Sequence, residues 1–339
     1  MDIQNAIKNL LEHRSLSADE MADVMHSIMT GDATQAQIGG FLIALRMKGE
    51  TVNEITGAAQ VMRKLATPVK IDLPHLVDTC GTGGDSSGIF NVSTASAFVV
   101  AVAGGHVAKH GNRSISSKSG SADLLEIAGV NLSIAPDQVA QCITEIGVGF
   151  MFAIHHHGAM KHAIGPRREL GVRTIFNLLG PLTNPAGAPN QVLGVFSKEW
   201  VRPIAEVLQN LGSKHVLVVH SADGLDEISV AAETYVAELV DDQIREYTVT
   251  PEQFGLSRGE LQNCIVAGAE ESLALINKAL QGGASAAGDM IALNAGAAIY
   301  AADLCDNLQQ GINMAKDILT SGKAKAKLDA LVSFTNQFR

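Results

Sequence analysis

Asp78-Thr79-Cys80-Gly81-Thr82-Gly83-Gly84-Asp85 is the stretch of sequence on which the fold depends. It follows a short apolar strand predicted over 75–78, and its glycines let successive backbone N–H groups point at one anion. A second polar turn, Asn91-Val92-Ser93-Thr94, opens an apolar run over 95–102 that predicts a buried helix. A helix N-terminus offers free N–H donors and a positive dipole to phosphate. Two anion sites a few residues apart indicate a ligand with more than one phosphate.

Strand and helix patterns alternate in the chain after Pro74. Strands are predicted over 75–78, 106–108, 150–154, 191–196 and 215–220, with antiparallel strands within 228–250. Helices are predicted between these strands and again over 270–281, 285–303, 307–321 and 323–337. This alternation is typical of an α/β fold with a central, mostly parallel sheet flanked by helices. Ligands of such sheets bind where the strands end at their carboxyl side.

The first 67 residues carry only helical patterns. Three Ser or Thr residues are each followed three positions later by Glu or Gln, which is the capping-box signature of a helix start. These pairs are Ser17 with Glu20, Thr34 with Gln37, and Thr51 with Glu54. We predict a small helical domain over 1–70, joined by the helical segment around 159–187. The large α/β domain would span 71–158 and 188–339, with a cleft between the domains and hinges near 68–73.

Composition limits the classes of partner. A formal net charge of −10 disfavours nonspecific binding to nucleic acid or acidic membranes, so an anionic ligand needs a local site. An aromatic content of 4% is low for a surface that stacks bases. No signal-peptide core precedes the first helix, no apolar run approaches membrane-spanning length, and the four cysteines show no paired spacing. These features predict a cytoplasmic protein with reduced thiols.

A second polar loop follows the strand predicted over 106–108. It reads Lys109-His110-Gly111-Asn112-Arg113-Ser114-Ile115-Ser116-Ser117-Lys118-Ser119-Gly120-Ser121. Its cations, amide and hydroxyl groups suit phosphate and sugar, and a loop after a strand is a common ligand site. The alternative interpretation is a solvated, flexible loop.

An acidic turn, Asp223-Gly224-Leu225-Asp226-Glu227, follows the strand predicted over 215–220. Mg²⁺ usually binds one or two carboxylates together with waters and substrate phosphates. Asp226 and Glu227 would therefore suit a magnesium site that neutralises a polyphosphate, whereas the alternative is an ordinary acidic surface turn.

Four other features each have two interpretations. His155-His156-His157 resembles a zinc cluster, but consecutive side chains diverge, which favours a wall of the pocket. Asp241-Asp242 faintly resembles an acidic phosphoribosyl loop, but a hairpin turn explains it better. Arg167 and Arg168 lie either on a solvated helix face or, one of them, across the cleft from a substrate carboxylate. Cys80 is better explained as a thiol buried at a strand end than as a nucleophile.

The ordered set of motifs resembles the anthranilate phosphoribosyltransferases of tryptophan biosynthesis over nearly the whole chain. The motifs are 81–85, 91–94, 109–112, 223–227 and Phe176-Asn177-Leu178-Leu179-Gly180-Pro181-Leu182-Thr183-Asn184-Pro185. The resemblance implies a homodimer formed largely through the small domain. It also implies transfer of ribose 5-phosphate from phosphoribosyl pyrophosphate to the amine of anthranilate, with Mg²⁺, two ions per subunit.

The resemblance also implies roles for individual residues. Anthranilate would contact Gly81, Asn112 and Arg167, and Mg²⁺ would be bound by Ser93, Asp226 and Glu227. Phosphoribosyl pyrophosphate would contact Gly81, Thr82, Gly83, Gly84, Asp85, Ile89, Asn91, Val92, Ser93, Thr94, Lys109, His110, Gly111, Asn112, Arg113, Ser114, Ile115, Ser116, Ser117 and Ser121.

Ile89 departs from the family pattern, which has Thr or Ser two positions before Asn91. A hydroxyl contact is lost there, although the backbone N–H of Ile89 could still serve. No general base is identifiable. His110 is a candidate by position alone, and a core or orienting histidine explains it equally well.

Two alternatives come from other functional classes. A pyrimidine nucleoside phosphorylase of the same fold would also act at ribose C1, but it needs no paired carboxylates, so Asp226 and Glu227 favour the transferase. A noncatalytic nucleic-acid-binding relative would need a basic surface and eroded phosphate loops, which the charge and the intact motifs oppose.

Overall fold

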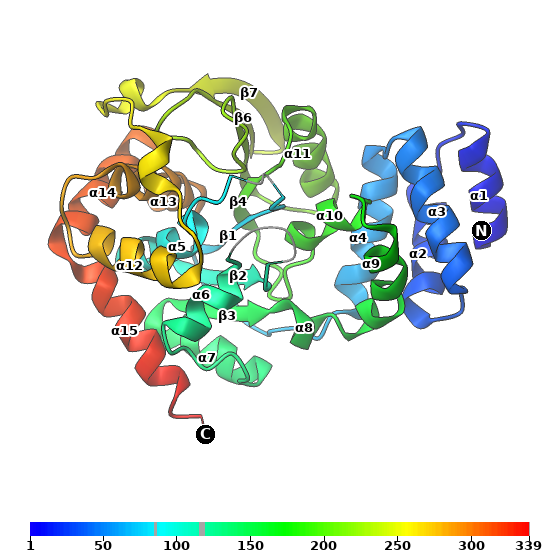
Figure 1. The fold of residues 1–339 in the computed structure, drawn as a ribbon, viewed down its shortest axis with the longest axis horizontal. Coiled ribbons are helices and arrows are strands. Elements are labelled where there is room, and N and C mark those ends of the chain that lie inside the picture. Colours follow the sequence, from blue (N-terminus) through cyan, green and yellow to red (C-terminus); the bar gives the residue numbers. More distant parts are fainter. Residues whose placement is uncertain (85–86, 115–118, 339) are drawn as a thin grey trace.

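The computed structural model describes residues 1–84, 87–114 and 119–338. Within them the chain forms a helical bundle and a larger α/β part built on one sheet (Figure 1), which confirms the predicted fold class. The strands are β1 Leu76–Gly81, β2 His106–Gly111, β3 Val148–Phe152, β4 Asn190–Gly194, β5 His215–Ser221, β6 Thr234–Val240 and β7 Gln243–Val249. Their order across the sheet is β3-β2-β1-β4-β5-β6-β7.

The five strands from β3 to β5 pair in parallel, whereas β6 pairs antiparallel with both of its neighbours, β5 and β7. The strand order changes direction between β1 and β4, because β2 and β3 lie on one side of β1 while β4 and β5 lie on the other. Sheets of this kind bind ligands at the carboxyl ends of the strands beside such a point, which here are β1 and β4. The hairpin prediction at Asp241 and Asp242 is confirmed, since both have positive φ angles (51° and 58°) in the turn between β6 and β7.

The N-terminal bundle contains α1 Ile3–Leu11, α2 Ala18–Thr30, α3 Gln35–Lys48 and α4 Val52–Leu65. All three predicted capping boxes are present, at the starts of α2, α3 and α4. α2 and α4 approach closely at Gly57, where an added Cβ would overlap the carbonyl oxygen of Ala18. Local capping therefore sets where the helices start. The lack of a side chain at Gly57 allows the close contact between α2 and α4.

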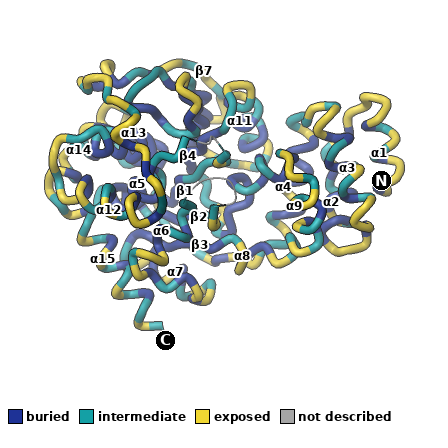
Figure 2. The backbone as a smooth tube through the Cα atoms, in the orientation of Figure 1, coloured by how far each residue is buried: buried dark blue, intermediate teal, exposed yellow. Residues whose placement is uncertain are grey.

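Helices cover both faces of the sheet (Figure 1). The helices that follow the bundle in the chain are α5 Val92–Val102, α6 Ser121–Ile127, α7 Pro136–Ile146, α8 Ala153–His156, α9 Ile164–Leu170, α10 Phe176–Leu179, α11 Val201–Asn210, α12 Ala269–Leu280, α13 Ala286–Ala301, α14 Leu308–Ser321 and α15 Lys323–Thr335. Of these, α9 packs against α3 and α10 against α4, so both lie with the bundle. Along β5, Leu217 and Val219 belong to the core with α5 and α13, whereas Val216 and Val218 belong to the core with α11. This alternation of side chains buries both faces of the central strands. Figure 2 shows that the exposed residues lie mainly at turns and on outer helices.

The segment around 159–187 packs against the bundle. Gln35 Nε2 donates to the His162 carbonyl at 3.2 Å, and Arg63 Nε donates to the Leu182 carbonyl at 2.6 Å. Buried residues of this segment, such as Phe176, share one hydrophobic cluster with the bundle. The same cluster continues through α11 to one face of the sheet. The division at 70, 159 and 187 therefore stays a prediction, which these contacts support.

The third strand differs from the prediction over 150–154. It spans Val148–Phe152, and Ala153 and Ile154 begin the short helix α8 instead. The reason is pairing: Phe152 lies opposite Gly111, where the partner strand β2 ends, so the next residues have no strand to pair with. No helix among the described residues has both the length and the apolar character needed to cross a membrane.

The bundle holds a buried ion pair between Lys48 and Glu54, with Nζ and Oε2 2.8 Å apart. Glu54 is fully buried and also accepts the backbone N–H groups of Leu16 and Thr51. We expect Glu54→Ala to lower the free energy of unfolding by about 3–5 kcal/mol, because it leaves the Lys48 ammonium buried without its partner. Denaturant unfolding followed by circular dichroism measures this change.

The matched control is Glu12→Ala, which breaks the pair between Arg14 and a Glu12 side chain that is 59% exposed. We expect this control to cost less than about 1 kcal/mol. Equal losses for the two variants would contradict a structural role for the buried pair.

Candidate functional site

The predicted loops meet at the carboxyl ends of β1, β2, β4 and β5, which end at Gly81, Gly111, Gly194 and Ser221. The Thr82 N–H donates to the Gly194 carbonyl at 2.9 Å, which holds the glycine loop across the point where the strand order changes direction. The tertiary structure therefore gathers three segments that lie far apart in the sequence, as the α/β prediction requires.

The glycine loop turns through Gly83 and Gly84, which have φ angles of 64° and 79°. Backbone in this region favours glycine. The Gly83 N–H donates to Asp226 Oδ2 at 2.7 Å, so one donor of the first predicted anion cradle faces the acidic turn. Arg173 donates to the Gly84 carbonyl and lies over the Phe196 ring, 4.4 Å from its centroid. Asp85 lies outside the described residues.

The second predicted cradle is the N-terminus of α5, with Asn91 as its N-cap. The Ser93 N–H donates to Glu227 Oε1 at 3.2 Å. The side chains of Val92 and Thr94 are buried, so neither side chain is presented to a ligand. The Val92 N–H donates to the Phe90 carbonyl at 2.8 Å. Both cradles thus already bind a carboxylate, which is direct evidence that their N–H groups suit an anion.

Lys109 lies beneath the two cradles and is almost fully buried. Its ammonium donates to the Thr79 carbonyl and to Ser93 Oγ at 3.3 Å. Burial lowers the pKa of Lys109, and the negative charges of Asp78 and Glu227 oppose this effect. Asp78 is also buried; burial raises its pKa, while Lys109 and the Asn184 amide, 2.8 Å away, act in the opposite direction. Lys109 thus places a positive charge beneath the two predicted cradles, and Asp78 supplies the negative charge that compensates it.

His110 forms part of a buried histidine contact. Its ring lies 5.1 Å from that of His157, measured between centroids. Burial, together with the neighbouring histidines and Lys109, holds the pKa of His110 well below its usual value, so the imidazole is neutral at pH 7. His156 binds the Thr67 carbonyl at 2.9 Å instead of joining the other two histidines. Across residues 1–84, 87–114 and 119–338, no group of three His, Cys, Asp or Glu side chains could hold a metal ion.

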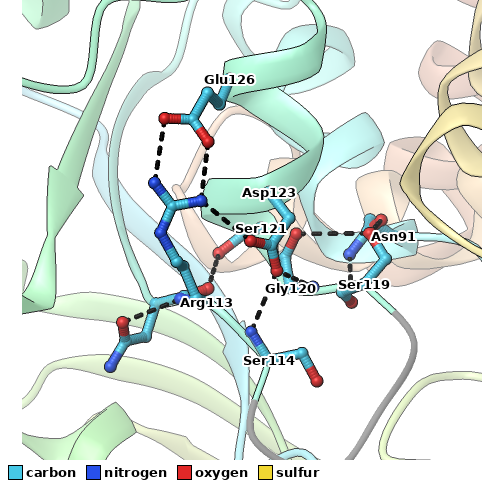
Figure 3. A network of polar contacts seen from close by, with 9 residues as sticks. Asn91, Arg113, Ser114, Ser119, Gly120, Ser121, Asp123 and Glu126 are labelled. Atoms are coloured by element: carbon cyan, nitrogen blue, oxygen red, sulfur yellow. Dashed lines mark hydrogen bonds and ion pairs between the residues drawn. The ribbon is translucent and has the colours of Figure 1, made fainter.

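The Lys109–Ser121 loop is held by the first turn of α6 (Figure 3). Asp123 accepts the N–H groups of Ser114 and Gly120, at 3.1 and 2.9 Å, so one carboxylate ties together two distant points of the loop. The Arg113 guanidinium turns toward α6, where it binds Glu126 at 2.7 and 2.9 Å. Arg113 therefore contributes to the shape of the loop. Its guanidinium is paired with Glu126, so it is not one of the loop cations that would face a phosphate. Ile115, Ser116, Ser117 and Lys118 lie outside the described residues.

Asn91 links this loop to the α5 N-terminus. Its side-chain amide donates to the Ser119 carbonyl at 3.1 Å and accepts the Ser272 hydroxyl at 2.8 Å. Ser121 lies close to Gly111, where an added Cβ would overlap its hydroxyl oxygen. These contacts bring the two phosphate segments and the start of α6 into one surface.

Ile89 lies at the edge of this surface. It forms an isolated bridge with Ile265, and its side chain packs against the core of the large domain. Its N–H donates to the Ser87 hydroxyl at 3.4 Å. The departure from the family pattern therefore places an apolar side chain in the core.

The acidic turn is crowded against the sheet. A Cβ added to Gly81 would overlap the Asp226 carboxylate, and one added to Gly194 would overlap the Asp226 backbone. Asp223, in contrast, points back into its own turn and accepts the hydroxyls of Ser221 and Ser229. Asp226 and Glu227 are thus the carboxylates that reach the cradles.

Arg167 and Arg168 lie in different environments. Arg168 is exposed. Arg167 is half-buried and lies over the Phe176 ring, 5.0 Å from its centroid, and burial lowers its pKa. This difference favours Arg167 as the arginine held in a defined position.

Cys80 is a free cysteine whose sulfur accepts the Gln191 amide at 3.1 Å. Burial raises the pKa of its thiol well above the usual value, which argues against a nucleophile.

Three residues of the site escaped the sequence analysis as functional candidates: Arg173, Gly194 and Asn294. Asn294, on α13, accepts the N–H of Ile228, the residue after Glu227, at 2.9 Å. Its signal was a single amide within an otherwise apolar helical run. Gly194 had no comparable signal, because its role is a contact between distant segments.

The chain matches two families, described as "Glycosyl transferase family, helical bundle domain" over residues 4–66 and "Glycosyl transferase family, a/b domain" over residues 73–325. A curated relative from Hahella chejuensis, named anthranilate phosphoribosyltransferase, is 63% identical and covers 100% of this chain and 99% of the relative. A Marinomonas relative of the same name is 62% identical, covering 100% of this chain and 98% of the relative.

Solved structures agree. That of anthranilate phosphoribosyltransferase from Thermus thermophilus has a TM-score of 0.93 and 44% identity, covering 98% of this chain and 99% of the other. The Saccharomyces cerevisiae enzyme in complex with PRPP and Mg has a TM-score of 0.89 and 28% identity, covering 99% and 98%.

Fold and matches together define a glycosyltransferase-class enzyme built from a helical bundle and an α/β domain. Within that class, the chain belongs to the anthranilate phosphoribosyltransferase family of tryptophan biosynthesis. These relatives support the transferase interpretation and give no support to the phosphorylase or the nucleic-acid-binding alternative.

Gly81 offers a direct test of the crowding at the acidic turn. We expect Gly81→Ala to lower kcat/KM roughly 100-fold, because the added methyl group displaces the Asp226 carboxylate, and misplacing a positioning group by about 1 Å has this order of effect. Steady-state kinetics measures the change. The control Gly268→Ala places its Cβ no closer than 3.7 Å to a neighbour and should retain activity. A fully active Gly81→Ala variant would disprove the crowding argument.

Proposed function

We propose that this chain transfers the 5-phosphoribosyl group of phosphoribosyl pyrophosphate to the amine of anthranilate and releases pyrophosphate. The observation that carries this proposal is the pairing of each anion cradle with one carboxylate, Gly83 with Asp226 and Ser93 with Glu227. An adjoining set of N–H donors and hard oxygen ligands suits a pyrophosphate group bound together with a cation.

The oxygen ligands available fit Mg²⁺, since two carboxylates and the Ser93 hydroxyl lie around the same cradles. We propose that Ser93, Asp226 and Glu227 hold Mg²⁺, two ions per subunit. The yeast relative solved with PRPP and Mg supports Mg²⁺ as the cation. When bound, Mg²⁺ would supply positive charge that neutralises the pyrophosphate.

The chain's own groups then explain the reaction. Backbone N–H groups of the glycine loop and the α5 N-terminus bind the pyrophosphate oxygens, and Lys109 adds positive charge beneath them. The bond between ribose C1 and the pyrophosphate oxygen breaks with its electron pair going to the oxygen, while the amine nitrogen bonds to C1 and loses a proton. The main contribution of the protein is to position the two substrates and to stabilise the leaving charge. No residue is assigned as the base, and His110 supplies a neutral wall.

We propose the site residues that the family resemblance implies, with a reduced role for Ile89 and Arg113. Asn112 and Gly81 would face anthranilate together with Arg167, whose guanidinium suits the carboxylate. The remaining phosphoribosyl pyrophosphate contacts are those of the two loops and the α5 turn, with Ile89 and Arg113 contributing backbone groups only.

We further propose a homodimer that forms through the small domain. An apolar groove on α1 and α3 supports this, lined by residues that include Leu10, Leu11, Ile43 and Met47. Leu11 and Met47 are 68% and 79% exposed, which is unusual for large apolar side chains and typical of an interface. We propose a cytoplasmic location, which the four free cysteines support.

The activity has a direct assay. We expect anthranilate fluorescence to fall when phosphoribosyl pyrophosphate and Mg²⁺ are added, and to stay constant when EDTA replaces Mg²⁺, because the pyrophosphate charge then lacks its counterion. Thymidine phosphorolysis is the control reaction and should not occur. Constant fluorescence with folded protein and both ligands would refute the proposed function.

Arg167 separates the two substrate sites. We expect Arg167→Ala to raise the KM for anthranilate roughly tenfold and the KM for phosphoribosyl pyrophosphate by less, since a charge-assisted hydrogen bond contributes about 1.5–3 kcal/mol. Arg168→Ala is the matched control, because it removes the same side chain from an exposed position on the same helix. The reverse pattern of KM changes would place Arg167 at the other substrate.

A further inference from the structure

Asn294 is a buried amide near the middle of α13, a helix whose other buried side chains are almost all apolar. Its Oδ1 accepts the Ile228 N–H at 2.9 Å, and its Nδ2 donates to the Ile228 carbonyl, also at 2.9 Å. A second donation goes to the Met290 carbonyl at 2.9 Å. The side chain thus binds both backbone groups of one residue, as a neighbouring strand would.

The residue so bound is the one directly after Glu227. Ile228 is 2% exposed, and its backbone groups would otherwise be buried without partners, which costs more free energy than an ordinary hydrogen bond contributes. Asn294 therefore determines where the chain leaves the acidic turn. A single amide in the core controls the backbone next to a carboxylate that reaches the α5 N-terminus.

Gly194 acts on the same turn from the sheet. It is the last residue of β4, and a Cβ at this position would overlap the carbonyl oxygen of Asp226. The backbone of Asp226 therefore rests directly on the strand end, and any larger residue would push the turn away. The Gly194 carbonyl also accepts the Thr82 N–H, so one residue sets the distance between the glycine loop and the acidic turn.

The support behind Asn294 is rigid. α13 packs against α14 at Gly296 and Gly311, where a Cβ on Gly311 would overlap the Gly296 carbonyl. α13 also packs against α5, whose N-terminus is the second cradle (Figure 1). The acidic turn and the α5 cradle are consequently held by neighbouring core helices, so their separation is set by core packing.

We propose that Asn294 and Gly194 are positioning residues that hold the Asp226 and Glu227 carboxylates against the two phosphate cradles, so that a divalent cation and a pyrophosphate group bind as one unit. This inference rests on the proposed function, since it assigns the cation to these carboxylates. Neither residue touches substrate; each acts on the backbone of the turn. Their loss should weaken cation-dependent binding of phosphoribosyl pyrophosphate and leave the anthranilate contacts unchanged.

The test measures phosphoribosyl pyrophosphate binding by calorimetry without anthranilate, so that no turnover occurs, over a range of Mg²⁺ concentrations. We expect Asn294→Leu to raise the Mg²⁺ concentration that gives half of the maximal affinity roughly tenfold, the usual effect of removing an outer partner of a metal ligand. The KM for anthranilate should change less than about twofold, because Asn294 acts on the acidic turn and not on the anthranilate contacts. The control Ile299→Ala loosens the same helix and keeps the Asn294 hydrogen bonds to Ile228, so it should lower Tm while leaving the Mg²⁺ requirement unchanged.

Other variants keep the test decisive if Asn294→Leu does not fold. Asn294→Asp keeps the acceptor for the Ile228 N–H but loses the donor to its carbonyl, and Gly194→Ala displaces Asp226 from the sheet side. Both should raise the Mg²⁺ requirement. An unchanged requirement in the folded variants, or an equal rise in Ile299→Ala, would overturn the inference. Wild-type binding that does not depend on Mg²⁺ would instead refute the proposed cation site.

Discussion

The close approach of the acidic turn to the ends of β1 and β4 is the constraint on which the site depends. Gly81 and Gly194 leave no room for a side chain at those strand ends, so Asp226 lies directly against the sheet. From there its carboxylate accepts the Gly83 N–H, while Glu227 accepts the Ser93 N–H at the start of α5. Three loops from separate parts of the chain are therefore spaced by close approach at two glycines and by carboxylates that accept backbone N–H groups.

Electrostatics explains how an acidic chain accommodates a strongly anionic substrate. The formal net charge is −10, so attraction over long distances does not favour an anion. In the proposed site, binding would depend instead on N–H groups, on a buried ammonium at Lys109 and on the cation. Within the core, burial lowers the pKa of Lys109 and so favours its neutral form. The negative charge of Asp78 opposes this effect and favours the ammonium.

Much of the fold was predictable because it follows from local patterns. The capping boxes of α2, α3 and α4 and the turn at Asp241 and Asp242 lie where the sequence indicated, since each depends on residues a few positions apart. The glycine loop, the Lys109 loop and the acidic turn were found for a similar reason, because each is a run of unusual composition. The end of β3 was predicted too late, because it depends on where its partner strand stops.

By itself the sequence determined the class of fold, the family and the segments that carry polar chemistry, because hydrophobic periodicity, capping and motif composition are local properties. Only the tertiary structure decided how these segments face one another. It turned Arg113 toward Glu126 and Asp123, buried Arg167 against Phe176 while leaving Arg168 exposed, and placed Asn294 behind the acidic turn. Contacts of the site join residues far apart in the sequence: Gly83 and Asp226 are 143 positions apart, and Asn91 and Ser272 are 181 apart. They depend on packing of the whole sheet and its helices, which no short stretch of sequence contains.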